Sequence, residues 1–99
     1  MRVVLSTLAE ADLEEIGDFV ALGNPRRAVT FIGEVRAKCQ RLGQAPGLCT
    51  ARPELGNGVR MLPHGRYLIF YREHDGAVRI ERVMHGARDI GGDDFDAEG

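Results

Sequence analysis

The sequence has few of the residues that hold small proteins together through covalent or metal bonds. Its 99 residues include only two cysteines, Cys39 and Cys49, and they form no CxxC pair. Neither cysteine has a histidine at the spacing of a zinc site, so we expect no metal centre, no cofactor and two reduced thiols. Tryptophan is absent, and Lys38 is the only lysine. The fold must therefore rest on its apolar core.

Long apolar runs are also absent. The longest covers residues 67–71, far short of the roughly 18 to 20 residues that cross a membrane. The first residues show no apolar stretch followed by a small-residue cleavage site, so no secretion signal is predicted. We therefore expect a cytoplasmic protein.

Length and charge indicate one ordinary globular domain. Hydrophobic residues make up 43% and charged residues 28% of the chain, a mixture that excludes a disordered or fibrous protein. The net charge is −2, but residues 44–90 hold seven arginines against five acidic residues, whereas residues 91–99 hold four acidic residues and no base. We expect a single domain over residues 1–90 and an acidic tail over residues 91–99. The composition of this tail suits either a solvated end or docking onto the basic half.

Two amphipathic helices are predicted in the first half of the chain. Thr7 and Glu10 match a capping box, in which each side chain satisfies a free backbone N–H at the start of a helix. Apolar residues then recur at helical spacing, at Ala9, Leu13, Ile16 and Val20. Gly23-Asn24-Pro25 ends this helix and starts a second, which runs to Gly43. Two helices joined this closely form an antiparallel hairpin.

Three strands are predicted in the second half, over residues 59–62, 66–73 and 77–85. Pro63-His64-Gly65 and His74-Asp75-Gly76 separate them as hairpin turns, and residues 44–58 are predicted to form a connecting loop. With a short strand over residues 3–5, the order of elements is β-α-α-β-β-β. This order predicts an α+β fold in which the helical hairpin packs on a small, mostly antiparallel sheet.

The central strand has apolar residues on both of its alternating faces. Residues 67–71 read Tyr-Leu-Ile-Phe-Tyr, which indicates burial on both sides, yet the helical hairpin covers only one of them. We expect the other face to be covered by a partner protein, or by the residues after His85 folding back onto it.

Several motifs lie in the order and at the spacing of a known family. They are residues 8–16 (LAEADLEEI), Asn24-Pro25, Cys39-x-x-Leu42 followed by Pro46-Gly47, Arg60, Tyr67-x-Ile69-Phe70-Tyr71-Arg72, and residues 82–90 (RVMHGARDI). Together they resemble the ParE branch of the RelE/ParE superfamily of type II toxins, over residues 3–90. The IFYR strand followed at hairpin distance by RVMHGARD carries most of this resemblance.

The resemblance implies a bacterial toxin of a toxin–antitoxin system, serving plasmid or chromosomal stabilisation. A small antitoxin encoded beside it would bind and neutralise it in a hetero-oligomeric complex. ParE members are known as inhibitors of DNA gyrase that act by protein–protein contact, without a cofactor or chemistry of their own. RelE members instead cut mRNA on the ribosome, and the shared fold does not decide between these functions.

The alternative function, ribosome-dependent mRNA cleavage, needs a base, an acid and cations around the scissile phosphate. If the chain is a ribonuclease, the catalytic candidates are Arg60, Arg72, Arg82 and His85. The chain departs from the RelE pattern, because its only lysine lies in the second helix, no tyrosine follows His85, and its end is acidic. We therefore expect a gyrase inhibitor rather than an enzyme.

A basic sheet with an apolar central strand suits an acidic antitoxin segment. The expected antitoxin-binding residues are Arg60, Tyr67, Ile69, Tyr71, Arg72 and Arg82. The candidates for contact with the target are Arg82, His85 and Arg88. Structural alternatives stay open, since exposed arginines serve solubility and cross-strand pairing, a histidine can close a strand, and tyrosines can belong to the core.

Overall fold

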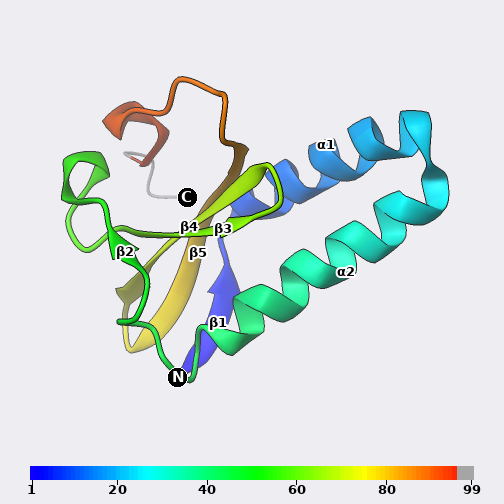
Figure 1. The fold of residues 1–99 in the computed structure, drawn as a ribbon. Helices are drawn as coiled ribbons and strands as arrows, with labels where there is room; N and C mark the ends of the chain where they lie inside the picture. The colour runs from blue at the N-terminus through cyan, green and yellow to red at the C-terminus, as the bar shows by residue number, and fades with distance from the viewer. Residues whose placement is uncertain (96–99) are drawn as a thin grey trace.

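The computed structural model describes residues 1–95 and has a helical hairpin packed on one face of a five-stranded sheet (Figure 1). Its elements are β1 (Arg2–Leu5), α1 (Thr7–Gly23), α2 (Pro25–Arg41), β2 (Thr50–Ala51), the 3₁₀ turn η1 (Pro53–Leu55), β3 (Arg60–His64), β4 (Tyr67–His74), β5 (Ala77–His85) and the 3₁₀ turn η2 (Gly92–Phe95). The predicted α+β fold and its order of main elements are confirmed. The segment predicted as a plain loop also contains β2 and η1.

The strands lie in the order β1-β5-β4-β3-β2. β1 runs parallel to β5, and the other neighbours pair antiparallel. This arrangement places β4 and β5 at the centre of the sheet, which agrees with the apolar pattern of residues 67–71. The far end of the hairpin extends well beyond the sheet in Figure 1.

The first helix is capped by Ser6, not by Thr7 as the capping-box pattern predicted. The Ser6 hydroxyl accepts the N–H of Ala9 at 3.0 Å and donates to the carbonyl of Glu81 at 2.8 Å. The Ser6 N–H also donates to the carbonyl of Ile80, so Ser6 ends the pairing of β1 with β5. Thr7 is therefore already helical, because the hydroxyl one residue earlier serves both the helix and the sheet. The second predicted cap is confirmed, since Asn24 accepts the N–H of Arg27 and Pro25 opens α2.

The Ser6→Ala substitution is expected to lower the free energy of unfolding by about 1–2 kcal/mol, because it removes a cap and leaves the buried carbonyl of Glu81 without its donor. Urea denaturation checks this value. Thr7→Ala is the matched control, and its effect is expected to stay within about 0.5 kcal/mol. Equal effects of the two substitutions would mean that Ser6 does not cap the helix in preference to Thr7.

One apolar core lies between the hairpin and the sheet. Its buried members include Leu13 from α1, Val35 and Cys39 from α2, and Ile69 and Ile80 from the central strands. Burial raises the pKa of the Cys39 thiol to about 11. The thiol is therefore protonated near neutral pH and belongs to the core.

A second apolar cluster covers the opposite face of the sheet. Its buried members are Leu55, Val59, Phe70, Met84 and Phe95. The ring of Phe95 meets the ring of Phe70 edge-on, with 5.1 Å between their centroids. This face is covered because η1 and the residues after His85 fold onto it. Of the two suggested covers, the returning chain is the one observed.

The expected acidic tail, as far as residue 95, docks on the sheet through Asp94 and Phe95, while residues 91–93 are exposed. Asp94 is half-buried, and Phe95 is 6% exposed. Asp96 and the residues after it lie outside the described residues. Among the described helices, none has the length and apolar character that a membrane crossing requires.

Candidate functional site

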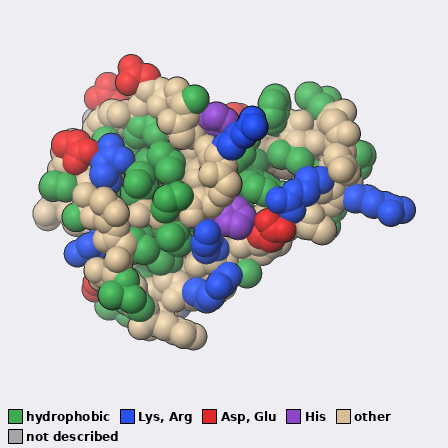
Figure 2. Space-filling model, in the orientation of Figure 1, with side chains coloured by type: hydrophobic (Ala, Val, Ile, Leu, Met, Phe, Trp, Pro, Cys, Tyr) green, Lys and Arg blue, Asp and Glu red, His purple; other side chains and the backbone are tan. Residues whose placement is uncertain are grey.

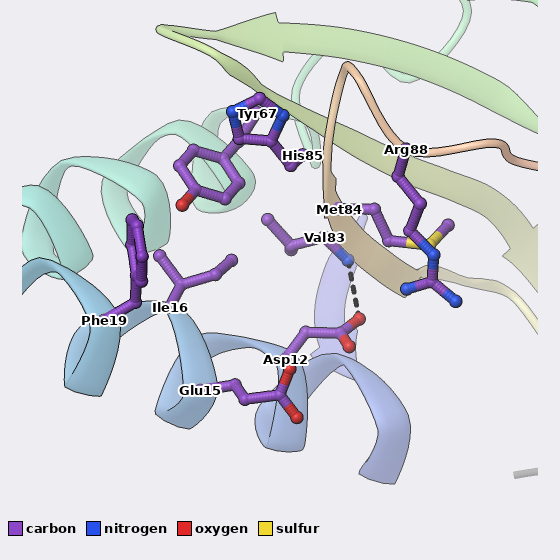
Figure 3. A pocket seen from close by; sticks show the side chains of 9 residues that line it. All are labelled: Asp12, Glu15, Ile16, Phe19, Tyr67, Val83, Met84, His85 and Arg88. Carbon is purple, nitrogen blue, oxygen red and sulfur yellow. Dashed lines mark hydrogen bonds between the residues drawn. The ribbon is translucent and has the colours of Figure 1, made fainter.

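A cleft of about 420 Å³ opens between α1 and the adjoining ends of β4 and β5 (Figure 3). Its lining residues are Asp12, Glu15, Ile16, Phe19, Tyr67, Val83, Met84, His85 and Arg88. Helix α1 supplies the acidic and apolar wall, and the strand ends supply the tyrosine and histidine. The cleft brings together three of the predicted residues, namely Tyr67, His85 and Arg88.

Tyr67 and His85 form an aromatic pair at this cleft. They are directly opposite each other in the β4–β5 pairing, and their rings meet edge-on at a centroid distance of 5.2 Å. Phe31 of α2 lies against the other side of this pair, 5.5 Å from the Tyr67 ring. The Nδ1 atom of His85 accepts the N–H of Ala87 at 3.0 Å, so the proton of the neutral ring is on Nε2. His85 itself is exposed.

On the α1 wall of the cleft, Asp12 fixes Arg82 in a two-pronged ion pair. The Nε and Nη2 atoms of Arg82 donate to the two carboxylate oxygens of Asp12 at 2.8 and 2.9 Å. The same carboxylate accepts the N–H of Val83 at 2.9 Å, which Figure 3 shows as a dashed line. Both charged side chains are 13% exposed, and the hydrogen bonds to Asp12 raise the pKa of Arg82. The contact joins α1 to β5.

A second ion pair lies in the middle of the sheet, where the pairing of β4 and β5 is irregular. Phe70 pairs with Arg82 and Tyr71 pairs with Ile80, which leaves Glu81 as an extra residue of β5. The Glu81 carboxylate, 8% exposed, accepts the Nε proton of Arg72 at 2.9 Å and lies 3.8 Å from Arg79. The guanidinium of Arg72 therefore has its charge compensated inside the chain.

The remaining predicted residues lie elsewhere on the sheet. Arg60 and Arg72 line a smaller cleft of about 200 Å³ beside the loop before β2. Arg60 donates to the carbonyl of Cys49 at 2.7 Å, and the buried Tyr71 hydroxyl donates to the carbonyl of Pro46 at 2.7 Å. Burial raises the pKa of Tyr71.

The six residues predicted to bind an antitoxin therefore do not form one continuous surface. The side chains of Ile69 and Tyr71 are 0% and 1% exposed and belong to the core under the hairpin. Tyr67 lines the larger cleft, whereas Arg60, Tyr71 and Arg72 line the smaller one. Arg82 is held by Asp12, which lines the larger cleft.

Sequence reasoning assigned no role to Asp12 or Asp94. Asp12 directly precedes Leu13, which belongs to the apolar stripe of α1 that faces the sheet. Because Asp12 lies at the edge of this stripe, its carboxylate can reach a neighbouring strand. Asp94 accepts from the Arg88 Nη2 atom at 2.9 Å and lies 3.6 Å from Arg82. The sequence feature that pointed to Asp94 was the acidic end of the chain, which follows the arginine-rich residues 44–90.

Apolar surface continues from the cleft along the projecting end of the hairpin. Phe19, which lines the cleft, is 68% exposed, and Leu22 and Val29 are 86% and 76% exposed. Figure 2 shows hydrophobic side chains on the surface of this end of the molecule. Exposed apolar groups gathered beside a cleft are typical of a surface that binds another protein.

Residues 3–90 match the family model described as the ParE toxin of the type II toxin–antitoxin system parDE. The chain belongs to the ParE toxin family. The resemblance in the sequence motifs is thereby confirmed, and the chain is a type II toxin of this family. No curated protein matches it.

Two solved structures share the ParE fold described above. One is the chromosomal ParDE toxin–antitoxin system from P. aeruginosa, with 25% identity and a TM-score of 0.73, over 86% of this chain and 95% of that one. The other is the RelBE2 toxin–antitoxin complex from Mycobacterium tuberculosis, with 27% identity and a TM-score of 0.62, over 88% of this chain and 92% of that one. The ParE-family chain is thus similar to toxins of both branches of the superfamily.

Proposed function

We propose that this ParE-family toxin inhibits DNA gyrase by protein–protein contact and is neutralised by an antitoxin encoded beside it. The observation that carries the proposal is the family match over residues 3–90. Both similar structures are named as toxin–antitoxin systems, which supports an antitoxin as the partner. The activity is proposed to be cytoplasmic and to need no cofactor.

The surface features support contact with proteins. His85 and Arg88 are the target-binding candidates that reach the surface, at the rim of the larger cleft. Arg82 acts on this rim through its pair with Asp12, which holds β5 against α1. For the antitoxin, Tyr67 offers an aromatic contact in the larger cleft, and Arg60 offers a cation in the smaller one. Arg72 lines the smaller cleft as well, with its charge shared with Glu81.

The ribonuclease alternative has less support from the geometry. Arg72 and Arg82 are paired with Glu81 and Asp12, so their charges are compensated before any phosphate arrives. Arg60 lines the smaller cleft, whereas His85 lines the larger one. Cations and a proton carrier that act on one scissile phosphate must converge on it.

Expression in bacterial cells tests both parts of the proposal. The toxin is expected to arrest growth and induce the DNA-damage response, and co-expression of the neighbouring antitoxin is expected to restore growth. Mapping of mRNA ends in the same cells tests the alternative. Growth arrest with new ribosome-dependent mRNA ends and no DNA damage would contradict gyrase inhibition.

The Arg60→Glu substitution is expected to weaken antitoxin binding at low salt about tenfold, because it reverses a cation that faces an acidic segment. Titration calorimetry at two salt concentrations measures the change. Arg66→Glu is the matched control, since Arg66 is exposed and lies outside the two clefts. Equal losses for both variants would mean that the smaller cleft has no part in binding.

A further inference from the structure

The arginines of the second sheet face hold a segment of this same chain. Arg72 donates from Nη2 to the carbonyl of Phe95 at 3.3 Å, and Arg82 donates from Nη1 to the carbonyl of Asp94 at 3.4 Å. The Asp94 carboxylate lies between Arg82, at 3.6 Å, and Arg88, at 2.9 Å. Three arginines from β4, β5 and the turn after β5 thus converge on two consecutive residues of η2.

The segment is held by two kinds of contact. Its carboxylate and carbonyls bind guanidinium groups, and the Phe95 ring packs on Phe70 and is 6% exposed. The segment also closes on itself, because the Asp94 N–H donates to the Gly91 carbonyl and the Gly91 N–H donates to the Asp94 carboxylate. An acidic residue followed by an aromatic one is therefore the ligand chemistry that this face accepts.

This occupancy limits what a partner can reach. The side chains of Arg72 and Arg82 are only 24% and 13% exposed. An acidic partner segment that binds these guanidinium groups must first displace the contacts from Asp94 and Phe95. Arg88, which is 48% exposed, is the one of the three that is most accessible at the outset.

We propose that residues 91–95 are a built-in competitor, occupying the arginine-lined sheet face that an acidic antitoxin segment with an aromatic residue takes over on binding. The incoming carboxylate replaces that of Asp94 between Arg82 and Arg88, and the incoming ring replaces that of Phe95 on Phe70. This inference rests on the proposed antitoxin as the partner. It adds that the free toxin covers its own binding face.

Competition between residues 91–95 and the antitoxin predicts a measurable change in the affinity for the antitoxin. A binding site that is open only for a fraction of the time shows an affinity reduced by that fraction. Asp94→Asn removes the charge between Arg82 and Arg88 and keeps Phe95, so it opens the segment without removing its ring. The full-length variant is expected to bind the antitoxin about three to ten times more tightly than the wild type.

Asp93→Asn is the matched control. Asp93 is exposed, and its substitution changes the net charge by the same amount as Asp94→Asn. Any gain in affinity that comes only from removing one negative charge, which an acidic partner would favour, therefore appears in Asp93→Asn as well. Its affinity is expected to lie within about twofold of the wild type. Thermal unfolding of both variants establishes that each is folded before binding is measured.

Hydrogen exchange on the wild-type toxin gives an independent readout. The Gly91 and Asp94 amides are expected to exchange faster in the antitoxin complex than in the free toxin, while the amides of β4 and β5 exchange more slowly. An antitoxin that binds while both amides stay protected, with Asp94→Asn no tighter than Asp93→Asn, would overturn the competitor and leave the proposed function standing. A folded toxin that binds no antitoxin would contradict the proposed partner, and the competitor with it.

Discussion

Asp12→Ala is expected to lower the free energy of unfolding by about 3 kcal/mol, since removing one member of a mostly buried ion pair is strongly destabilising. Arg82 would keep only the more distant carboxylate of Asp94, at 3.6 Å. The substitution would remove the two hydrogen bonds that the 13%-exposed Arg82 side chain donates to Asp12, and it would leave the Val83 N–H without an acceptor. It would also loosen α1 from β5 on one wall of the larger cleft. Urea denaturation followed by circular dichroism measures the loss.

Two further variants separate the contributions at this contact. Asp12→Asn keeps an acceptor for the Val83 N–H but loses the charge, so its effect is expected to fall between the wild type and Asp12→Ala. Asp18→Ala removes an exposed acid from the same helix and is expected to change stability by less than about 0.5 kcal/mol. An Asp12→Ala effect no larger than that of Asp18→Ala would show that the ion pair does not hold the helix to the strand.

Phe95→Ala is expected to cost about 3 kcal/mol of stability, because truncating a buried phenylalanine removes its apolar contacts and leaves a cavity. Phe95 is 6% exposed and packs on Phe70 in the second cluster, although it lies near the end of the described residues. Leu48→Ala is the control, since Leu48 is 84% exposed. The two variants are compared by their urea midpoints.

The outcome of this comparison decides whether the second sheet face is closed by the chain itself. A large loss for Phe95→Ala and none for Leu48→Ala would establish residues 91–95 as part of the folded domain. Equal and small effects would mean that residues 91–95 do not cover their part of the second face in the free toxin. In that case the antitoxin would meet no competitor there.

The features that were predicted correctly depend on local pattern. Asn24-Pro25 placed the turn of the hairpin, because the cap and the proline act within one helical turn. The apolar run over residues 67–71 identified a central strand, since burial on both faces leaves no polar alternation. The ordered motifs then identified the family.

The features that were missed depend on contacts between distant parts of the chain. Ser6 caps the first helix because its hydroxyl also meets Glu81, which lies 75 residues later. Asp12 pairs with Arg82 across 70 residues, and no spacing rule along the chain connects them. The extra residue at Glu81 shifts the pairing of β5, so alternation did not reveal that Glu81 and Arg72 share a face.

The most direct test of gyrase inhibition adds the purified, antitoxin-free toxin to DNA gyrase, ATP and supercoiled plasmid, and quantifies linear DNA after detergent and protease. The account predicts that linear DNA accumulates with toxin concentration and disappears when the antitoxin is added first. A folded toxin that arrests growth in cells but yields no linear DNA, and leaves supercoiling by gyrase unchanged, would contradict it.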